Sequence, residues 1–217
     1  MSLLRTGEFE SDIITHCAAY IRPESTVIDV GANIGLHTVH FAQAARLGKV
    51  ICFEPARATF AQLLKNVAGL ANVIPLNVAL SDKAGLQLLF VASDNAYSGL
   101  KDTRRKAVLY QEWVPCFNGD AILEPLTRET SVDLIKIDVE GLERQVLEGM
   151  SALLTAHRPI ICCEIFGGEQ SNADPTGTVE YCVSLGYQAF VIEDGRLIAQ
   201  AAHNDALYTY IFIPRHR

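Results

Sequence analysis

Two spacings of apolar residues alternate along the chain. Short apolar runs rich in β-branched residues are typical of strands buried on both faces of a parallel sheet. Such runs lie at Thr26–Val30, Lys49–Phe53, Asn72–Asn77, Val132–Val139 and Pro159–Ile165. Between the runs, apolar residues repeat at every third or fourth position, which predicts amphipathic helices. These helices cover Gly35–Arg46, Ala58–Val67, a stretch from Glu140 to Leu153 and a stretch from Val179 to Leu185.

Strands that alternate with helices predict an α/β fold with a doubly wound, mostly parallel, Rossmann-like sheet. A further helix over residues 8–21, which Pro23 ends, precedes the first strand and either packs on the core or roofs a ligand site. Pro75 favours an edge position for the third strand. The last two strands are predicted at Tyr187–Ile192 and Leu207–Pro214.

Residues 83–118 interrupt this alternation. Strand-like runs at Leu86–Val91 and Val108–Phe117 flank a loop-forming stretch at Ser93–Gly99. We expect a small antiparallel β insertion near 83–118, of the kind that carries specificity or a partner surface on a common scaffold. A second polar loop, Gly167–Pro175, is a candidate lid.

Composition limits the classes of function. The 217 residues are 49% hydrophobic and 20% charged, which predicts one globular domain over residues 1–217. The net charge of −7 argues against nucleic-acid binding, which needs a basic face. We interpret the short basic cluster Arg104-Arg105-Lys106 as a solvated turn. No apolar run is long enough to span a membrane, and the first residues become polar too soon for a signal peptide.

The six cysteines form no Cys-x-x-Cys pair. Cys52 and Cys162-Cys163 lie inside apolar runs, where cysteine behaves as a small hydrophobic residue. We therefore expect no metal site, and a reducing, cytoplasmic setting.

The strongest local signal is the sequence that follows the first strand. The run Val27–Val30 turns through Gly31 and Gly35 into a helix, which is a nucleotide-binding arrangement. Dinucleotide sites use Gly-x-Gly-x-x-Gly, whereas the middle glycine is missing here. The carboxylate of Asp29 would repel a phosphate but attract an ammonium or a sulfonium. S-adenosylmethionine (SAM) carries both cations and no phosphate, so the turn favours a SAM site.

A second acid follows the second strand. Glu54 lies close to the interval of about 20 residues at which an acid accepts the two ribose hydroxyls of a nucleotide. Pro55 ends the strand, so Glu54 stands at its carboxyl end, where ligands of open α/β sheets bind. The stretch Asn77–Asp82 follows the third strand, and its loop is expected to meet the adenine.

A third signal is the stretch Ser131–Gly141. Its apolar strand contains Lys136 and Asp138, and a buried lysine needs a paired acid. Asp138 or Glu164 is the expected partner. If this strand neighbours the first one, the cleft between them is the topological switch point at which Asp29, Glu54, Asn77 and Asp138 converge.

With these residues in view, the chain resembles the FkbM family of SAM-dependent methyltransferases, which have the class I methyltransferase fold. The resemblance covers roughly residues 25–166 as an ordered set of motifs. The motifs are Val27–Gly35, Phe53–Pro55, Asn77–Asp82 and Ile135–Gly141 with Glu143. The resemblance implies a seven-stranded sheet whose last strand runs antiparallel. It implies SAM contacts at Asp29, Gly31, Asn33, Gly35, Glu54, Asn77, Val78 and Ala79. We add Ala32, within the glycine turn, and Asp138 to the expected cofactor-binding residues.

The expected reaction is O-methylation of a hydroxyl on a small molecule or a sugar. A hydroxyl acceptor needs its proton removed, and the candidates are Asp138, Glu140, His37 and Glu164. Asp138 could instead hold the amino group of SAM or pair with Lys136. His37 is either a base near the methyl group or a solvated residue of the first helical turn. Asp138, Glu140 and Glu164 could also bind Mg²⁺ through oxygens, which we rank below a metal-free site.

Two other classes of function remain open. An NAD-dependent oxidoreductase on a Rossmann-type fold needs phosphate-compatible glycines and a ribose acid, and only the acid is present. A non-catalytic SAM-binding protein on the same fold is the other alternative.

Overall fold

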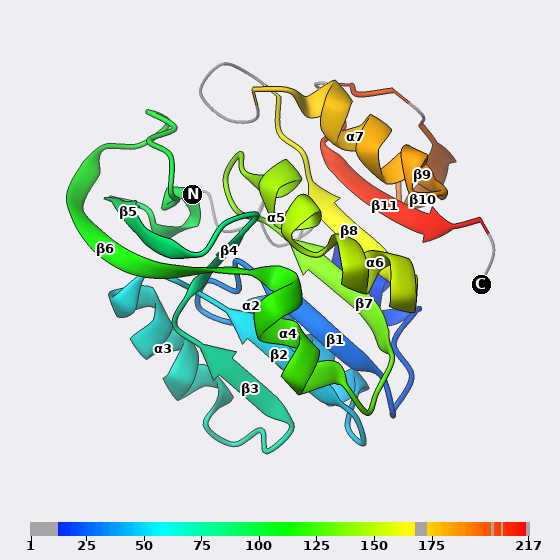
Figure 1. Cartoon of the computed structure of the whole chain (residues 1–217), viewed down its shortest axis with the longest axis horizontal. Coiled ribbons are helices and arrows are strands. Elements are labelled where there is room, and N and C mark those ends of the chain that lie inside the picture. The colour runs from blue at the N-terminus through cyan, green and yellow to red at the C-terminus, as the bar shows by residue number, and fades with distance from the viewer. Residues whose placement is uncertain (1–12, 168–172, 201, 205, 216–217) are drawn as a thin grey trace.

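The computed structural model describes residues 13–167, 173–200, 202–204 and 206–215. Its strands and helices alternate from β1 to β3 and again from β7 to β9 (Figure 1). The strands of the large sheet are β1 (Thr26–Val30), β2 (Lys49–Phe53), β3 (Val73–Leu76), β7 (Val132–Ile137), β8 (Ile160–Glu164), β9 (Tyr187–Glu193), β10 (Arg196–Ala199) and β11 (Thr209–Pro214). The helices are α2 (Leu36–Ala44), α3 (Arg57–Val67), α4 (Gly119–Thr127), α5 (Glu143–Gly149), α6 (Ser151–His157) and α7 (Pro175–Ser184).

The large sheet has the order β10-β9-β11-β8-β7-β1-β2-β3 within the described residues. β1 pairs in parallel with both β2 and β7, as expected for the switch point, and β3 with Pro75 is an edge strand. β11, the last strand in the chain, runs antiparallel between β8 and β9. The predicted doubly wound sheet with an antiparallel last strand is therefore confirmed. β10 extends the seven expected strands to eight, because the turn at Asp194-Gly195 returns the chain as a hairpin on β9.

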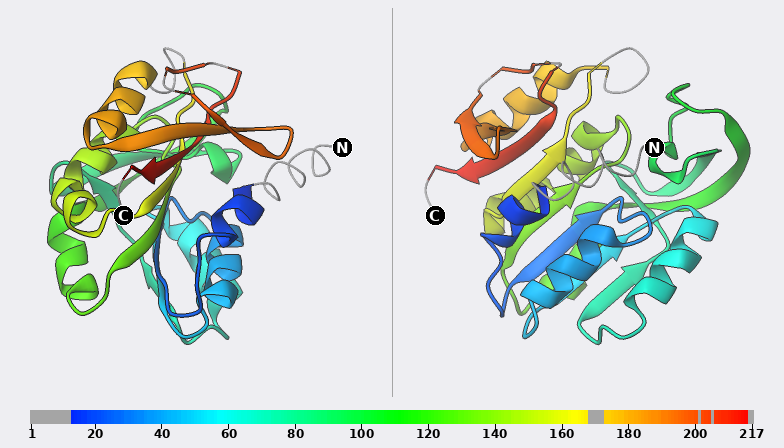
Figure 2. Two further views of the ribbon diagram at one scale, coloured as in Figure 1. Left: turned by 90° about the vertical axis from the view of Figure 1, so that its right-hand side faces the viewer. Right: turned by 180° about the vertical axis from the view of Figure 1, so that it is seen from behind.

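Helices cover both faces of this sheet (Figure 2). Successive residues of a strand point to opposite faces of the sheet, so the side chains of β1 contribute to a hydrophobic core on each face. Ile28 and Val30 pack in a core with residues of α4 to α7. Val27 packs on the other face with Phe41 of α2. None of the helices within the described ranges has the length and apolar character needed to cross a bilayer.

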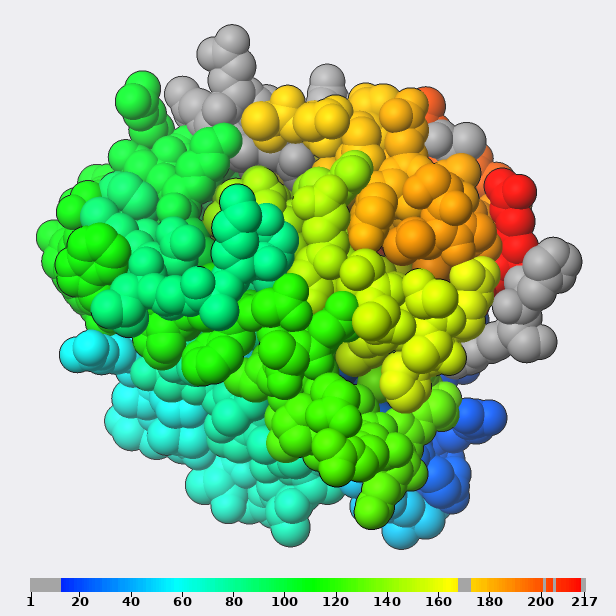
Figure 3. Space-filling model, in the orientation of Figure 1, coloured from blue at the N-terminus to red at the C-terminus, as the bar shows by residue number. Residues whose placement is uncertain are grey.

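The insertion forms a second, three-stranded sheet of β4 (Ala79–Ser81), β5 (Gly85–Ala92) and β6 (Val108–Asn118), in the order β4-β6-β5. β5 and β6 are antiparallel as expected, whereas β4 and β6 pair in parallel. One face carries a buried cluster that includes Leu89 and Val114. On the opposite face of this sheet, Leu86 and Trp113 are exposed. The insertion forms the upper left part of the molecule in Figure 3.

Three local predictions needed correction or fall outside the described residues. The helix predicted from Glu140 to Leu153 is two helices, α5 and α6, that meet at Met150. Gly149 ends α5, where a Cβ atom would lie 2.1 Å from the carbonyl oxygen of Ser81. Residues 13–18 are helical as predicted, while residues 8–12 of that helix and most of the candidate lid at 167–175 are outside the described residues.

Candidate active site

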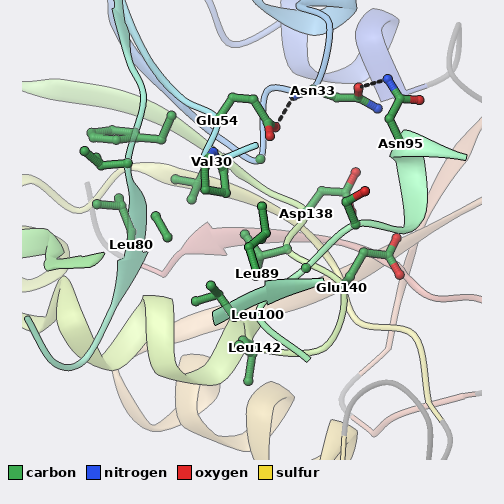
Figure 4. A pocket seen from close by; sticks show the side chains of 18 of the residues that line it. Val30, Asn33, Glu54, Leu80, Leu89, Asn95, Leu100, Asp138, Glu140 and Leu142 are labelled. Atoms are coloured by element: carbon green, nitrogen blue, oxygen red, sulfur yellow. Dashed lines mark hydrogen bonds between the residues drawn. The ribbon is translucent and has the colours of Figure 1, made fainter. Parts of the chain in front are cut away.

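A cavity lies at the carboxyl ends of β1, β2 and β7 (Figure 4). Its lining residues come from both sheets and include three acids but, among the described residues, no lysine or arginine. They are Val30, Gly31, Asn33, Phe53, Glu54, Pro55, Val78, Ala79, Leu80, Leu89, Asn95, Ala96, Ser98, Gly99, Leu100, Asp138, Val139, Glu140 and Leu142. The acids and asparagines lie along one side, and the side chains of Leu80, Leu89, Leu100 and Leu142 lie on the other.

The glycine turn brings the ends of β1 and β7 into close contact. Gly31 has a φ of 78°, and a Cβ atom there would lie 1.8 Å from the carbonyl oxygen of Asp138. The Asp138 amide donates to the Val30 carbonyl at 3.0 Å. Only glycine allows this approach, because any side chain would push Asp138 away from the cavity.

The amides of this turn donate to groups within the protein. Gly31 and Ala32 both donate to the Phe53 carbonyl, Asn33 donates to a Glu54 carboxylate oxygen, and Gly35 donates to the Ala32 carbonyl. A pyrophosphate site needs such amides directed at the ligand. These four amides are therefore engaged within the protein rather than directed at a pyrophosphate, although Gly31 and Asn33 line the cavity.

Glu54 is held rigidly at the end of β2. Oε1 accepts the Ala56 amide at 2.8 Å and Oε2 accepts the Asn33 amide at 3.0 Å, so the carboxylate is oriented by backbone on both sides. Its side chain lines the cavity, yet the residue is only 7% exposed. Burial raises the pKa of Glu54 to about 7, and the two amides oppose this shift. The lone pairs that remain on its oxygens can accept hydroxyl donors.

Asn77 supports Glu54 from behind. Its side-chain amide donates to the carbonyls of Glu54 and Pro55 at 2.8 and 2.9 Å. The next residues, Val78 and Ala79, line the apolar part of the cavity beside Leu80. The apolar lining of this part is of the kind that an aromatic base requires.

A buried charge network lies beneath the turn. Lys136 is 3% exposed, and its Nζ lies 3.2 Å from Asp138 Oδ2 and 4.0 Å from Asp29 Oδ1. Burial opposes the lysine charge, but Asp138, Asp29 and Glu164 raise the pKa of Lys136 above its usual range. The ion-pair partners are thus Asp138 and Asp29, and Glu164 adds negative charge nearby.

Asp29 lies below the cavity rather than on its wall. It is fully buried, points to the α2 face of the sheet, and accepts the Thr38 hydroxyl at 2.6 Å. Burial raises the pKa of Asp29, while Lys136 and Thr38 oppose that shift. Ala32, Gly35 and Asn77 are likewise behind the residues that line the cavity. Asp138, by contrast, has a side chain that is 31% exposed and faces the cavity.

Glu140 sits on a strained piece of backbone. Its φ is 59°, and Gly141 follows with a φ of 102°. The carboxylate of Glu143 accepts the Gly141 amide at 2.9 Å and so fixes this loop, which explains why Glu143 is buried at the start of α5. Burial raises the pKa of Glu140 to about 7, with a contribution from Asp138 that Arg105 opposes. Strained residues at a cavity wall are a common feature of functional sites.

His37 does not reach the cavity. It is 7% exposed on α2, with its ring centroid 5.9 Å from that of Phe41. Burial, together with the charge of Lys136, lowers the pKa of His37 to about 3. A pKa of about 3 makes the imidazole a weak base, and His37 is absent from the lining residues, so it is poorly suited to take a proton from an acceptor.

The insertion contributes residues that sequence reasoning missed. Asn95, on a short 3-10 helix at Asn95–Tyr97, donates to the Asn33 side chain at 2.8 Å. The cluster Arg104-Arg105-Lys106 forms an exposed bend, as predicted, but Arg105 also pairs with Glu140 at 3.0 Å, which the sequence did not indicate. No local pattern identifies either residue, because both reach the site through the pairing of β5 and β6.

The described residues contain no group of three His, Cys, Asp or Glu side chains arranged to hold a metal ion. Asp138 and Glu140 are instead engaged by Lys136 and Arg105. The Mg²⁺ alternative therefore has no assembled ligand set in the described part of the chain.

The strand order, the glycine turn after β1 and the acid after β2 define a class I methyltransferase fold. More narrowly, the methyltransferase FkbM domain model matches residues 29–189, and the chain belongs to this family. The crystal structure of methyltransferase FkbM from Methylobacillus flagellatus matches with a TM-score of 0.59, at 15% identity, over 88% of this chain and 44% of that one. That likeness is one of fold.

Two curated relatives match over most of this chain. The hexuronic acid methyltransferase AglP of Haloferax volcanii is 31% identical over 160 residues, which span 73% of this chain and 63% of that protein. The 2-O-methyltransferase NoeI of Sinorhizobium fredii is 27% identical over 153 residues, which span 63% of this chain and 62% of that protein. The chain thus covers a little less than two thirds of the length of these relatives.

Proposed function

We propose that this chain binds SAM in the cavity at the ends of β1, β2 and β7 and catalyses O-methylation of a sugar or small-molecule hydroxyl. The observation that carries the proposal is the cavity wall itself, where three carboxylates stand beside a turn in which the amides of Gly31, Ala32, Asn33 and Gly35 already donate within the protein. Such a wall favours a cationic nucleoside and disfavours a pyrophosphate. Membership of the FkbM family supports the same reaction class.

The residues fit SAM group by group. Glu54 would accept the two ribose hydroxyls, and the apolar surface at Val78, Ala79 and Leu80 would cover the adenine. Asp138 would receive the cationic methionine portion. Asp29 would act from below, by keeping Lys136 charged and in place. When bound, SAM supplies a methyl group already activated by its sulfonium.

The chain's own residues then align the acceptor and take its proton. Asp138 and Glu140 are the two carboxylates on the cavity wall that could do so. A pKa of about 7 makes Glu140 a base of suitable strength near neutral pH. We leave His37 out of this set on the evidence of its position.

A sugar acceptor is supported by the two relatives, one named for a hexuronic acid and the other for a 2-O position. The acidic net charge of −7 supports a small acceptor over a nucleic acid. Six free, buried cysteines support a reducing compartment such as the cytoplasm.

A thermal-shift experiment with SAM, S-adenosylhomocysteine and NAD tests the cofactor. A ligand that binds only the native state raises the melting temperature. We expect both adenosyl compounds to stabilise the protein and NAD to have no effect. Stabilisation by NAD alone would favour the oxidoreductase alternative, and radiolabel transfer from SAM to a panel of sugars would separate an enzyme from a non-catalytic SAM-binding protein.

A further inference from the structure

Residues 95–105, here called the roof segment, border the cavity and contact the large sheet at two places, the glycine turn after β1 and the loop after β7. At one end, Asn95 donates to Asn33 on the glycine turn at 2.8 Å. At the other end, Arg105 donates to Glu140 after β7 at 3.0 Å. Ala96, Ser98, Gly99 and Leu100 lie between these ends and line the cavity.

The middle of the roof segment belongs to the small sheet. Gly99 exchanges two backbone hydrogen bonds with Phe90 of β5, at 2.9 and 3.2 Å. Gly99 also packs directly on Glu140, because a Cβ atom there would lie 3.3 Å from the Glu140 Cβ. The roof segment is therefore anchored on the small sheet, and it meets the ends of the large sheet's strands at Gly99 and through the side chains of Asn95 and Arg105.

Arg105 makes the most extensive of these end contacts. Its guanidinium carbon lies 4.4 Å from the Tyr97 ring centroid and 4.5 Å from that of Phe166, which follows β8. Its Nη1 donates a hydrogen bond to the Glu140 carboxylate, and the side chain is 29% exposed. A planar guanidinium can stack on rings and donate from its edge at the same time, which lysine cannot do.

Glu140 needs such a partner. Its backbone has a positive φ, and its carboxylate stands near the acids Asp138 and Glu143 in a largely buried position. The negative charges of Asp138 and Glu143 disfavour the ionised form of Glu140. A cation that faces Glu140 from the insertion stabilises that ionised form. Arg105 is that cation.

We propose that Arg105 is a positioning residue that holds the Glu140 carboxylate on the cavity wall and keeps the roof segment closed over the cofactor. The proposal rests on the SAM site proposed above. Entry and release of the cofactor would require this pair to open. The acceptor would then meet a Glu140 that is already oriented.

Surface plasmon resonance with S-adenosylhomocysteine tests the effect on the cofactor. We expect Arg105→Gln to raise the dissociation rate by about tenfold or more, as for loss of a closing contact over a ligand. Arg105→Lys should restore only part of the wild-type rate, because it keeps the charge without the planar fork. The matched control is Arg104→Gln, an exposed neighbour, which should dissociate at the wild-type rate. A wild-type dissociation rate in Arg105→Gln would overturn the proposal.

Hydrogen exchange of the unliganded protein gives a readout that does not depend on SAM. Amides in residues 93–107 should exchange faster by about tenfold in Arg105→Gln, whereas those of β1 and β7 should not change. Unchanged exchange in residues 93–107 would also overturn the proposal. If the wild-type protein fails to bind S-adenosylhomocysteine, the proposed function fails, and the exchange data alone decide the role of Arg105.

Discussion

Each carboxylate on the cavity wall is held by a different kind of partner, and the partner determines what the carboxylate can do. Backbone amides hold Glu54 and leave lone pairs for hydroxyl donors. Lys136 holds Asp138 from below, and Arg105 holds Glu140 from the insertion. Three acids can thus share one small site because each has its own source of positive charge or donors.

The pKa of Glu54 leads to a prediction on cofactor affinity. Burial raises this pKa to about 7, so the side chain is mostly protonated at pH 6 and ionised at pH 8. The ionised form accepts both ribose hydroxyls, so calorimetry should show that S-adenosylhomocysteine binds more tightly as the pH rises from 6 to 8. Glu54→Gln should weaken binding at pH 8 by about 1.5–3 kcal/mol and flatten this dependence.

The control for this prediction is Glu124→Gln, which removes an exposed carboxylate on α4 far from the cavity lining. It should keep the wild-type affinity at each pH. A Glu54→Gln protein whose affinity follows the wild-type pH profile would remove Glu54 from the cofactor site.

Lys136 is expected to matter for stability. Lys136→Met leaves Asp29 fully buried without its cation, and breaking a buried pair in this way costs about 3–5 kcal/mol. Urea unfolding should report that loss. Lys65→Met, an exposed lysine on α3, should change the free energy of unfolding by less than about 0.5 kcal/mol. Equal stabilities of the two variants would contradict the charge network.

Asp138→Asn separates cofactor binding from proton transfer. The amide keeps the shape and removes the charge, and Asp29 remains as a partner for Lys136. We expect the fold to persist and methyl transfer to fall by about 10²-fold or more. If Asp138 positions the cofactor, affinity for SAM falls with the rate; if it is the base, affinity survives. A variant with wild-type affinity and turnover would make Asp138 only the partner of Lys136.

Sequence reasoning placed correctly the cavity residues whose position follows from a strand end. Glu54 and Asp138 end predicted strands, and the ends of neighbouring parallel strands meet at one sheet edge. The contacts of Arg105 were not predicted, because two of its partners, Glu140 and Phe166, are distant from it in the sequence. Local composition around Arg105 resembles any exposed turn. The burial of His37 was not predicted either, because helix periodicity did not show that this residue of α2 would lie inside the protein.

Among the elements, the turn between β1 and α2 determines the geometry of the site. Because Gly31 has no side chain, the backbone after β1 can contact the carbonyl of Asp138 after β7. The end of β1 therefore determines where the end of β7 lies. The helices and strands whose apolar residues repeat regularly were predicted from that periodicity. The helix α4 was not predicted, although Asn118 caps it, because Pro125 interrupts its pattern.

Gly31→Ala tests the close contact of the two strand ends. A methyl group would meet the Asp138 carbonyl oxygen at 1.8 Å, in a backbone conformation that alanine disfavours. We expect a loss of about 2–4 kcal/mol in the free energy of unfolding, together with weaker binding of S-adenosylhomocysteine, because Asp138 must move. Gly69→Ala has open space around the new methyl group and should retain both properties. Wild-type affinity in Gly31→Ala would show that Asp138 does not need its observed position.

At the scale of the whole molecule, the cavity exists because two sheets meet. The large sheet supplies the acids and the glycine turn, and the small sheet supplies Leu89 and the roof segment. Alternating strands and helices predicted the first sheet almost completely. The insertion was predicted as strands, but its docking over the strand ends could not be predicted, since it depends on tertiary contacts such as that between Gly99 and Glu140.

The most direct test of this account is a crystal structure of the protein with S-adenosylhomocysteine. The account predicts ribose hydroxyls within hydrogen-bond distance of the Glu54 carboxylate, adenine against Val78–Leu80, and the sulfur atom facing Asp138 and Glu140 beneath the roof segment. A ligand bound away from the ends of β1, β2 and β7, or a ribose that does not contact Glu54, would contradict it.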